Sequence, residues 1–234
     1  LKQMGYNLQV LNLVNLDHSM TFNPLANLHS DQDVVKFAEQ VMATDVAGRT
    51  NTGQKIDVFW KNAAEALFEA IIFFIRDELP EEEQTMATVN RLFKIVTLKP
   101  DRIDTAFSIL NSKESDYYFD DYTPDSDDNR LIGDYLFDWV RENDPDSTSI
   151  RMWDQVRGMA GSPRTWSSVV GILGSDMAAY NLHDVENLLS GNQIQFAKLL
   201  EPKNALFVLY ADAYSSKNFL PNILYAQLIK FLYH

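Results

Sequence analysis

Apolar residues gather in two short stretches near the ends of the chain and follow helical spacing over most of the length between them. Within residues 6–25, the aliphatic residues crowd into nine positions: Leu8, Val10, Leu11, Leu13, Val14 and Leu16. This density is typical of a strand that is covered on both faces, as in a parallel sheet. A similar stretch, residues 205–211, precedes Asp212. We expect parallel strands side by side over residues 8–13 and 205–211, because each strand alone would leave its backbone groups unpaired.

The spacing of apolar residues between these stretches predicts a series of helices. The predicted helices cover residues 30–45, 57–76, 86–96, 102–110, 131–142, 148–159, 163–173 and 182–189, and a long amphipathic helix follows over residues 215–234. Ser30, Ser147 and Ser162 stand at N-cap positions, and Pro163 suits the first helical position after Ser162. The sequence therefore predicts a mainly α fold, in which a large helical insertion lies between two strands of an α/β core.

The charge and composition of the chain indicate which kinds of molecule it is suited to bind. The chain has 234 residues, with 20 Lys and Arg against 33 Asp and Glu, which gives a formal net charge of −13. Such a surface repels phosphate backbones at long range and favours a basic protein partner. The turn at Gly161, with Arg151, Arg157 and Arg164 around it, has a weak helix-turn-helix pattern, but the net charge argues against DNA reading. The absence of cysteine excludes disulfides, thiolate metal sites and cysteine nucleophiles.

No nucleotide-binding motif is complete in this sequence. In residues 48–55, GRTNTGQK, Gly48 and Gly53 have the spacing of a phosphate loop, but the Lys stands one place late. No Ser or Thr follows that Lys and no strand precedes the loop, although the motif requires both. Asp212 after the second strand resembles a Walker B ending without its adjacent Glu. We therefore expect no catalytic residue and no cofactor in this chain.

Metal ligation also has little support. His183, Asp184 and Glu186 are ligands by residue type, but no HExxH pattern exists, and a capping or surface role is favoured. The histidines are too scattered for a Ser-His-Asp arrangement: His18, His29, His183 and His234. We expect no metal site.

The clearest shift in composition is residues 111–130, NSKESDYYFDDYTPDSDDNR, where seven carboxylates are interleaved with aromatic residues. An EF-hand loop that starts at Asp125 would need Gly and Glu where the chain has Arg130 and Leu136, so calcium is disfavoured. One interpretation is a solvated loop whose aromatic side chains pack on the helices. The other is a docking surface for a basic partner. Its candidate residues are Asp116, Tyr117, Tyr118, Asp120, Asp121, Tyr122, Asp125, Asp127 and Asp128.

We expect neither a signal peptide nor a membrane span in this sequence. The most apolar helical stretch, residues 63–75, includes Glu65 and Glu69 and is shorter than the roughly 20 residues of a spanning helix. The first residue is Leu1, just upstream of a strand, and we expect the chain to be a piece of a longer protein.

Several segments resemble, in their order, the type IV secretion coupling proteins, which are TraG/TraD-like conjugation ATPases. The segments are Gly5-Tyr6, Val10-Leu11-Asn12-Leu13, His18-Ser19, Phe22-Asn23-Pro24-Leu25, Phe59-Trp60 with Ala63, Leu67 and Ala70, Ala87-Thr88-Val89-Asn90-Arg91-Leu92, Ala205-Leu206-Phe207-Val208, Asp212, Ser215, Asn218-Phe219-Leu220 and Gln227-Leu228. The two ends of the chain match best, and residues 99–164 agree only in being helical.

The resemblance implies a fragment that covers the all-helical domain between the Walker A and Walker B motifs of a RecA-like ATPase core. It implies that residues 1–25 are a strand and connection of the nucleotide-binding domain, that residues 26–200 form the all-helical domain, and that residues 201–234 are the returning strand and helix of the nucleotide-binding domain. It further implies ATP and Mg²⁺ for the parent protein only, a parent homo-hexamer, and a cytoplasmic position at the inner face of the membrane through segments absent from this chain. The helical domain would dock relaxase or an accessory protein to the secretion channel, with DNA contacted through the full hexamer.

A second function class stays open at this point. A free-standing helical protein-interaction or regulatory domain without motor activity would have the same composition and helix pattern. A phosphate loop upstream and a strand ending in Asp-Glu downstream would distinguish the motor fragment from this alternative.

Overall fold

The computed structural model describes residues 2–43, 58–102, 130–210 and 219–233. The chain divides into two compact units, each built from segments far apart in sequence. The first unit comprises Leu1–Gln54, Pro80–Ala87 and Asp176–His234, and the second comprises Lys55–Leu79 and Thr88–Ser175. The domain boundaries that we place at residues 25 and 200 stay a prediction.

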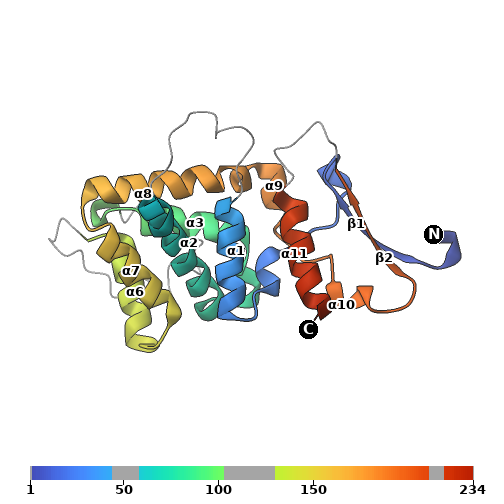
Figure 1. Cartoon of the computed structure of the whole chain (residues 1–234), viewed down its shortest axis with the longest axis horizontal. Coiled ribbons are helices and arrows are strands. Elements are labelled where there is room, and N and C mark those ends of the chain that lie inside the picture. The colour runs from blue at the N-terminus through green and yellow to red at the C-terminus, as the bar shows by residue number, and fades with distance from the viewer. Residues whose placement is uncertain (1, 44–57, 103–129, 211–218, 234) are drawn as a thin grey trace. The chain divides into compact units, whose positions relative to one another are not determined.

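The described residues contain one sheet, and it joins the two ends of the chain. Strand β1 (Asn7–Asn12) pairs in parallel with β2 (Asn204–Leu209), in a register that sets Asn7 opposite Asn204 and Asn12 opposite Leu209. The two strands run side by side in Figure 1. The predicted parallel pair is therefore confirmed, although Ala211 lies outside the described residues.

The two faces of this sheet differ in burial. Gln9, Leu11 and Leu13 on one face are almost inaccessible to solvent. The opposite face includes Phe207 and Leu209, which are 41% and 42% exposed. Our expectation that both strands are covered on both faces is thus wrong for the described residues. The sequence pattern shows that both faces of the strands carry apolar residues, but in the described part of the chain only one face is covered.

The buried face of the sheet also contains a polar contact that the pattern of apolar residues does not predict. Gln9 is 2% exposed, and its side chain binds the backbone of Gln195 twice. Gln9 Nε2 donates to the Gln195 carbonyl at 3.1 Å, and the Gln195 N–H donates to Gln9 Oε1 at 2.7 Å. The Gln9 side-chain amide therefore pairs with both the N–H and the carbonyl of Gln195, as a neighbouring strand would do.

The first unit also contains helices. They are α1 (Asp31–Ala43), α9 (His183–Leu188), α10 (Phe196–Leu199) and α11 (Phe219–Tyr233). Short 3-10 turns occur at Lys2–Met4, Leu16–His18, Pro24–Asn27, Glu81–Glu83 and Met177–Asn181. Ser30 caps α1 as predicted: Ser30 Oγ accepts from the Asp33 N–H, and Asp33 Oδ2 accepts from the Ser30 N–H at 3.0 Å. This reciprocal pair is a capping box in which Asp takes the usual place of Glu.

The second unit is helical. Its elements are α2 (Val58–Glu78), α3 (Met86–Val96, whose first two residues belong to the first unit), a 3-10 turn at Pro100–Arg102, α6 (Ile132–Asn143), α7 (Thr148–Met159) and α8 (Pro163–Asp176). Ser147 and Ser162 cap α7 and α8 as predicted, since each hydroxyl accepts a hydrogen bond from a backbone N–H of the first turn. The predicted helix at 102–110 lies almost wholly outside the described residues.

Aromatic side chains form the centre of the second unit. Helix α2 is buried along most of its length, and Phe74 contacts Phe137 edge-on at a centroid distance of 5.9 Å. Phe137 in turn stacks on Trp153 at 4.6 Å. The helical spacing of Phe59 with Ala63 and Leu67 predicts a buried position for Phe59. In the structure Phe59 is 42% exposed, because it lies in the first turn of the helix. None of the described helices combines the length and apolar composition that a membrane crossing requires.

Helices α6 and α7 approach each other closely at Gly133. A Cβ atom on Gly133 would lie 2.4 Å from Trp153 Cη2 and 2.8 Å from the Val96 carbonyl oxygen. Gly171 in the middle of α8 has no heavy atom within 4 Å of its corresponding position. Gly133 is therefore required by packing, whereas Gly171 is not.

We expect Gly133→Ala to lower the free energy of unfolding by about 1–3 kcal/mol, because the new methyl group overpacks the contact with Trp153. Gly171→Ala is the matched control and should raise stability by about 0.5–1 kcal/mol, since Ala is the better helix former. Urea unfolding followed by circular dichroism measures both. Equal effects of the two substitutions would show that α6 and α7 do not meet at Gly133.

Candidate functional site

The residues that we predict as a docking surface lie outside the described residues. They are Asp116, Tyr117, Tyr118, Asp120, Asp121, Tyr122, Asp125, Asp127 and Asp128, all within residues 103–129. The loop at residues 48–55 and Asp212 also lie outside the described part. Their roles stay predictions.

The candidate metal ligands are placed on the short helix α9. His183 Nε2 lies 3.2 Å from the side-chain nitrogen of Asn187, and Asp184 Oδ1 accepts a hydrogen bond from the Val185 N–H at 3.0 Å. Across the described residues, no three His, Cys, Asp or Glu side chains gather in a way that would hold a metal ion.

The arginines of the weak helix-turn-helix pattern are mostly occupied within the fold. Arg151 donates to the Asp146 carbonyl and to Thr148 Oγ1, at 2.9 and 2.7 Å. Arg157 pairs with Asp134 and lies over the ring of Trp166. Two of the three cations are therefore held by contacts within the second unit.

Asp134 is the polar centre of the second unit, and sequence reasoning missed it. Its carboxylate accepts hydrogen bonds from the Leu131 N–H at 2.7 Å, from Trp153 Nε1 at 3.0 Å and from Arg157 Nε at 2.9 Å. The side chain is only 15% exposed, so these donors replace the water that a carboxylate otherwise binds. Asp134 thereby caps α6 and ties it to α7. An Asp three residues after a helix start was the available signal.

A carboxylate cluster near the end of α2 carries an electrostatic cost. Partial burial raises the pKa of Glu78 above its ordinary value, and the negative charges of Asp144 and Asp77 raise it further. Arg76 is bound to Asp77 through Nε at 2.6 Å.

The first unit contains a groove among its described residues. Its volume is about 950 Å³, and it is walled by α1, α11 and the turn that precedes α1. The lining residues are Asn27, Leu28, His29, Ser30, Gln32, Asp33, Lys36, Phe37, Gln40, Leu200, Ala226, Gln227, Ile229, Lys230 and Phe231. The lining is mainly apolar in surface, with two lysines and one aspartate.

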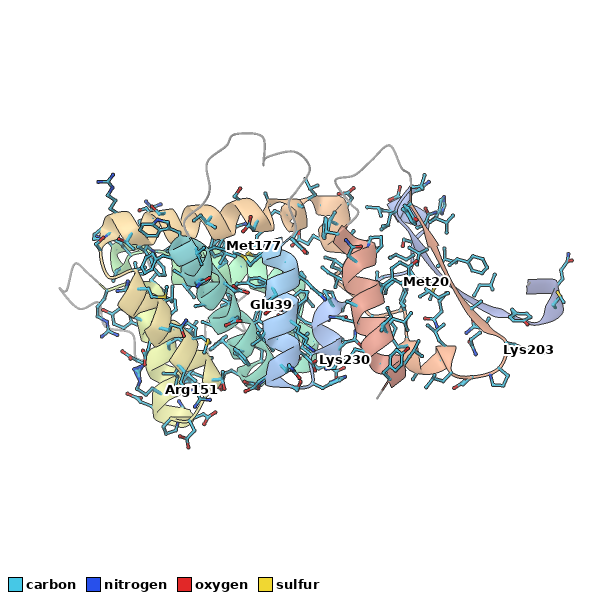
Figure 2. The ribbon with its side chains drawn as sticks, in the orientation of Figure 1. Met20, Glu39, Arg151, Met177, Lys203 and Lys230 are labelled. Atoms are coloured by element: carbon cyan, nitrogen blue, oxygen red, sulfur yellow. The ribbon has the colours of Figure 1, made fainter. Side chains whose placement is uncertain are left out.

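An ion pair holds the two walls of this groove together. Asp33 on α1 is buried and binds Lys230 on α11. Asp33 Oδ2 also accepts hydrogen bonds from the backbone N–H groups of His29 and Ser30, at 3.1 and 3.0 Å. Figure 2 shows Lys230 on α11 next to α1. The charge of Asp33 is therefore fully compensated inside the protein.

The edges of the sheet are unequal. The backbone groups of Val10 and Asn12 in β1 point away from β2 and are bonded by the segment that follows β1. The Met20 N–H donates to the Val10 carbonyl at 2.9 Å, and the Asn12 N–H donates to Ser19 Oγ at 2.9 Å. On β2 the corresponding outward residues are Leu206 and Val208, because alternate residues of a parallel strand bond to opposite sides. Within the described residues nothing pairs with the outward backbone groups of Leu206 and Val208. Among the described residues, the β1 edge of the sheet is covered and the β2 edge is unpaired.

Comparison with known proteins agrees with the resemblance in the sequence. The profile of the family described as "Type IV secretory system Conjugative DNA transfer" matches residues 1–234, which is the whole chain. No curated protein matches the chain. The match from end to end, together with the parallel pairing of the two terminal segments, identifies this chain as a member of the type IV secretory system conjugative DNA-transfer family.

Proposed function

We propose that this chain is the cargo-recognition domain of a conjugative coupling ATPase, together with the strands that anchor it. The observation that carries the proposal is the parallel pair β1–β2. It joins residues 7–12 to residues 204–209, and the helices are inserted between these strands in a chain that the family profile matches throughout. Such an insertion adds a surface to a core without interrupting the core's sheet.

The unpaired edge of β2 supports the proposal that these two strands belong to a larger sheet. Phe207 and Leu209 are exposed beside backbone groups that have no partner in the described residues. An unpaired apolar edge is a site of further strand pairing. We place the two strands in the RecA-like core of the parent protein, whose phosphate loop would precede Leu1 and whose Asp-Glu strand would follow His234. The parent would act as a hexamer at the inner face of the membrane, with ATP and Mg²⁺ bound to segments outside this chain.

The docked cargo would be a relaxase or an accessory protein, delivered to the secretion channel. The acidic residues of the 111–130 segment would steer a basic protein surface, and its aromatic residues would supply buried anchors. DNA would be held mainly elsewhere in the hexamer, because DNA affinity comes largely from Lys and Arg that neutralise phosphates. The net charge of −13 supports this division of roles.

For nucleotide chemistry, the proposal expects no ATP turnover by the purified 234-residue chain, because its sequence has no complete phosphate loop. A coupled assay for ADP release at saturating ATP and Mg²⁺ measures this. The matched control is Lys55→Ala, which removes the one lysine of the loop-like segment 48–55. Saturable turnover that Lys55→Ala abolishes would contradict the proposal.

For cargo binding, replacing Asp120, Asp121, Asp125, Asp127 and Asp128 with Asn should weaken the binding of the purified relaxase about tenfold at low salt. The loss should shrink at high salt, because screening already weakens exposed charges there. Fluorescence anisotropy with labelled relaxase measures the affinity, and circular dichroism checks the fold.

The control variant removes five exposed carboxylates elsewhere, so that both variants have the same net charge. These are Asp17, Asp101, Glu142, Asp146 and Glu201, replaced by Asn or Gln. Equal losses in both variants would mean that net charge, and not the 111–130 segment, attracts the partner. Unchanged affinity of the first variant at low salt would contradict the docking role and favour the interpretation of that segment as a solvated loop.

A further inference from the structure

The C-terminal half of α11 exposes apolar side chains at helical spacing. Tyr225, Ile229 and Leu232 are 41%, 54% and 52% exposed and stand at positions i, i+4 and i+7 of one face. The sequence pattern predicts an amphipathic helix over this region, with Ile229 and Leu232 on its buried side. That expectation holds for Phe219–Leu224 and is wrong for the following turns, because no described segment covers them.

This exposed stripe continues into the groove between α1 and α11. Ile229 lines the groove together with Phe231 and with Leu200, which is 64% exposed. Three large apolar side chains are therefore accessible to solvent on one concave surface of the first unit. Concentrated apolar exposure of this kind marks interaction sites more often than ordinary surface.

Among the residues that line the groove, lysines outnumber carboxylates. Its lining contains Lys36 and Lys230 but only one carboxylate, Asp33. Asp33 is buried and already neutralised by Lys230 and by two backbone N–H groups. Lys36 is exposed and enters no ion pair or hydrogen bond among the described residues. In a chain of net charge −13, this groove is thus a local site where a carboxylate is favoured.

We propose that the groove binds an amphipathic helical segment of a partner protein, with apolar anchors on one face and carboxylates beside them. The apolar anchors would contact Leu200, Ile229 and Phe231, and a flanking Asp or Glu would pair with Lys36. A volume of about 950 Å³ accommodates several side chains, as a helix placed in a groove requires. Polar groups at the rim, such as Gln32, offer additional hydrogen bonds.

This surface differs from the 111–130 segment in the partner chemistry that it selects. The 111–130 segment favours cations, whereas the groove favours anions next to apolar groups. The inference rests on the first unit alone and does not depend on the proposed cargo role. A failure of the groove experiment would leave the relaxase experiment unaffected.

The test uses two labelled peptides of about 15 residues, a length that permits partial helicity. Both peptides have Leu at positions i, i+4 and i+7. One has Glu at the flanking positions and the other has Lys there. Fluorescence anisotropy with the whole chain at low salt measures binding. The proposal expects the Glu peptide to bind at least about tenfold more tightly than the Lys peptide, since like charges at the rim also oppose the Lys peptide.

Two variants locate the binding surface. Lys36→Glu should weaken binding of the Glu peptide about threefold to tenfold, and Ile229→Ser should weaken it by a similar factor through lost apolar contact. The matched controls are Lys94→Glu on α3 and Leu182→Ser, which is 49% exposed, and both should bind as the unchanged chain does. Lys230 is unsuitable for substitution, because its loss would leave Asp33 buried without its partner.

Equal affinity for the two peptides, or loss of binding in the control variants, would overturn the proposal. Light scattering identifies the competing occupant, which is a second copy of this chain. Concentration-dependent dimers that Ile229→Ser disrupts, with no peptide binding, would assign the groove to self-association and would equally overturn the proposal.

Discussion

The pairing of two backbone segments that lie almost the whole chain apart is the constraint on which the first unit depends. A strand in isolation leaves its N–H and C=O groups without partners, and β1 and β2 each supply what the other lacks. Leu13 N–H donates to the Leu209 carbonyl at 2.8 Å, which extends the pairing beyond β1 itself. Because parallel strands cannot be joined by a tight turn, a long connection between them is obligatory. Here that connection includes the whole second unit.

Polar contacts fix the residues at which helices begin, which apolar packing alone would not determine. Asp33 fixes the start of α1 and binds Lys230, while Asp134 fixes the start of α6 and binds Trp153 and Arg157. In each case one carboxylate accepts a hydrogen bond from the backbone N–H of the residue just before the helix and also binds a side chain from another helix. Removing such a carboxylate would leave buried donors without acceptors, which costs more than the loss of one exposed ion pair. The two units thus use the same device independently.

Sequence reasoning predicted these elements best where local chemistry decides the outcome. The limits of α3 and α7 follow from apolar spacing and caps, and the parallel strands follow from the density of aliphatic residues. It failed where burial depends on what else covers a surface, as for Phe59, for Phe207 and for the last turns of α11. Asp134 was missed because its partners are 19 and 23 residues away in sequence. The predicted docking residues lie outside the described residues, and their role stays a prediction.

The central claim is that the two ends of this chain form adjacent parallel strands around a helical insertion. The chain has no cysteine, so a pair introduced at Asn7 and Asn204 would report directly on this pairing. These residues are opposite each other, and their side chains already meet through a hydrogen bond of 2.8 Å. Mild oxidation followed by intact-mass and peptide analysis should show an intramolecular disulfide in Asn7→Cys/Asn204→Cys and none in Asn12→Cys/Asn204→Cys, where the positions are five residues out of register. A disulfide in the second pair but not in the first would indicate antiparallel strands and would contradict the account.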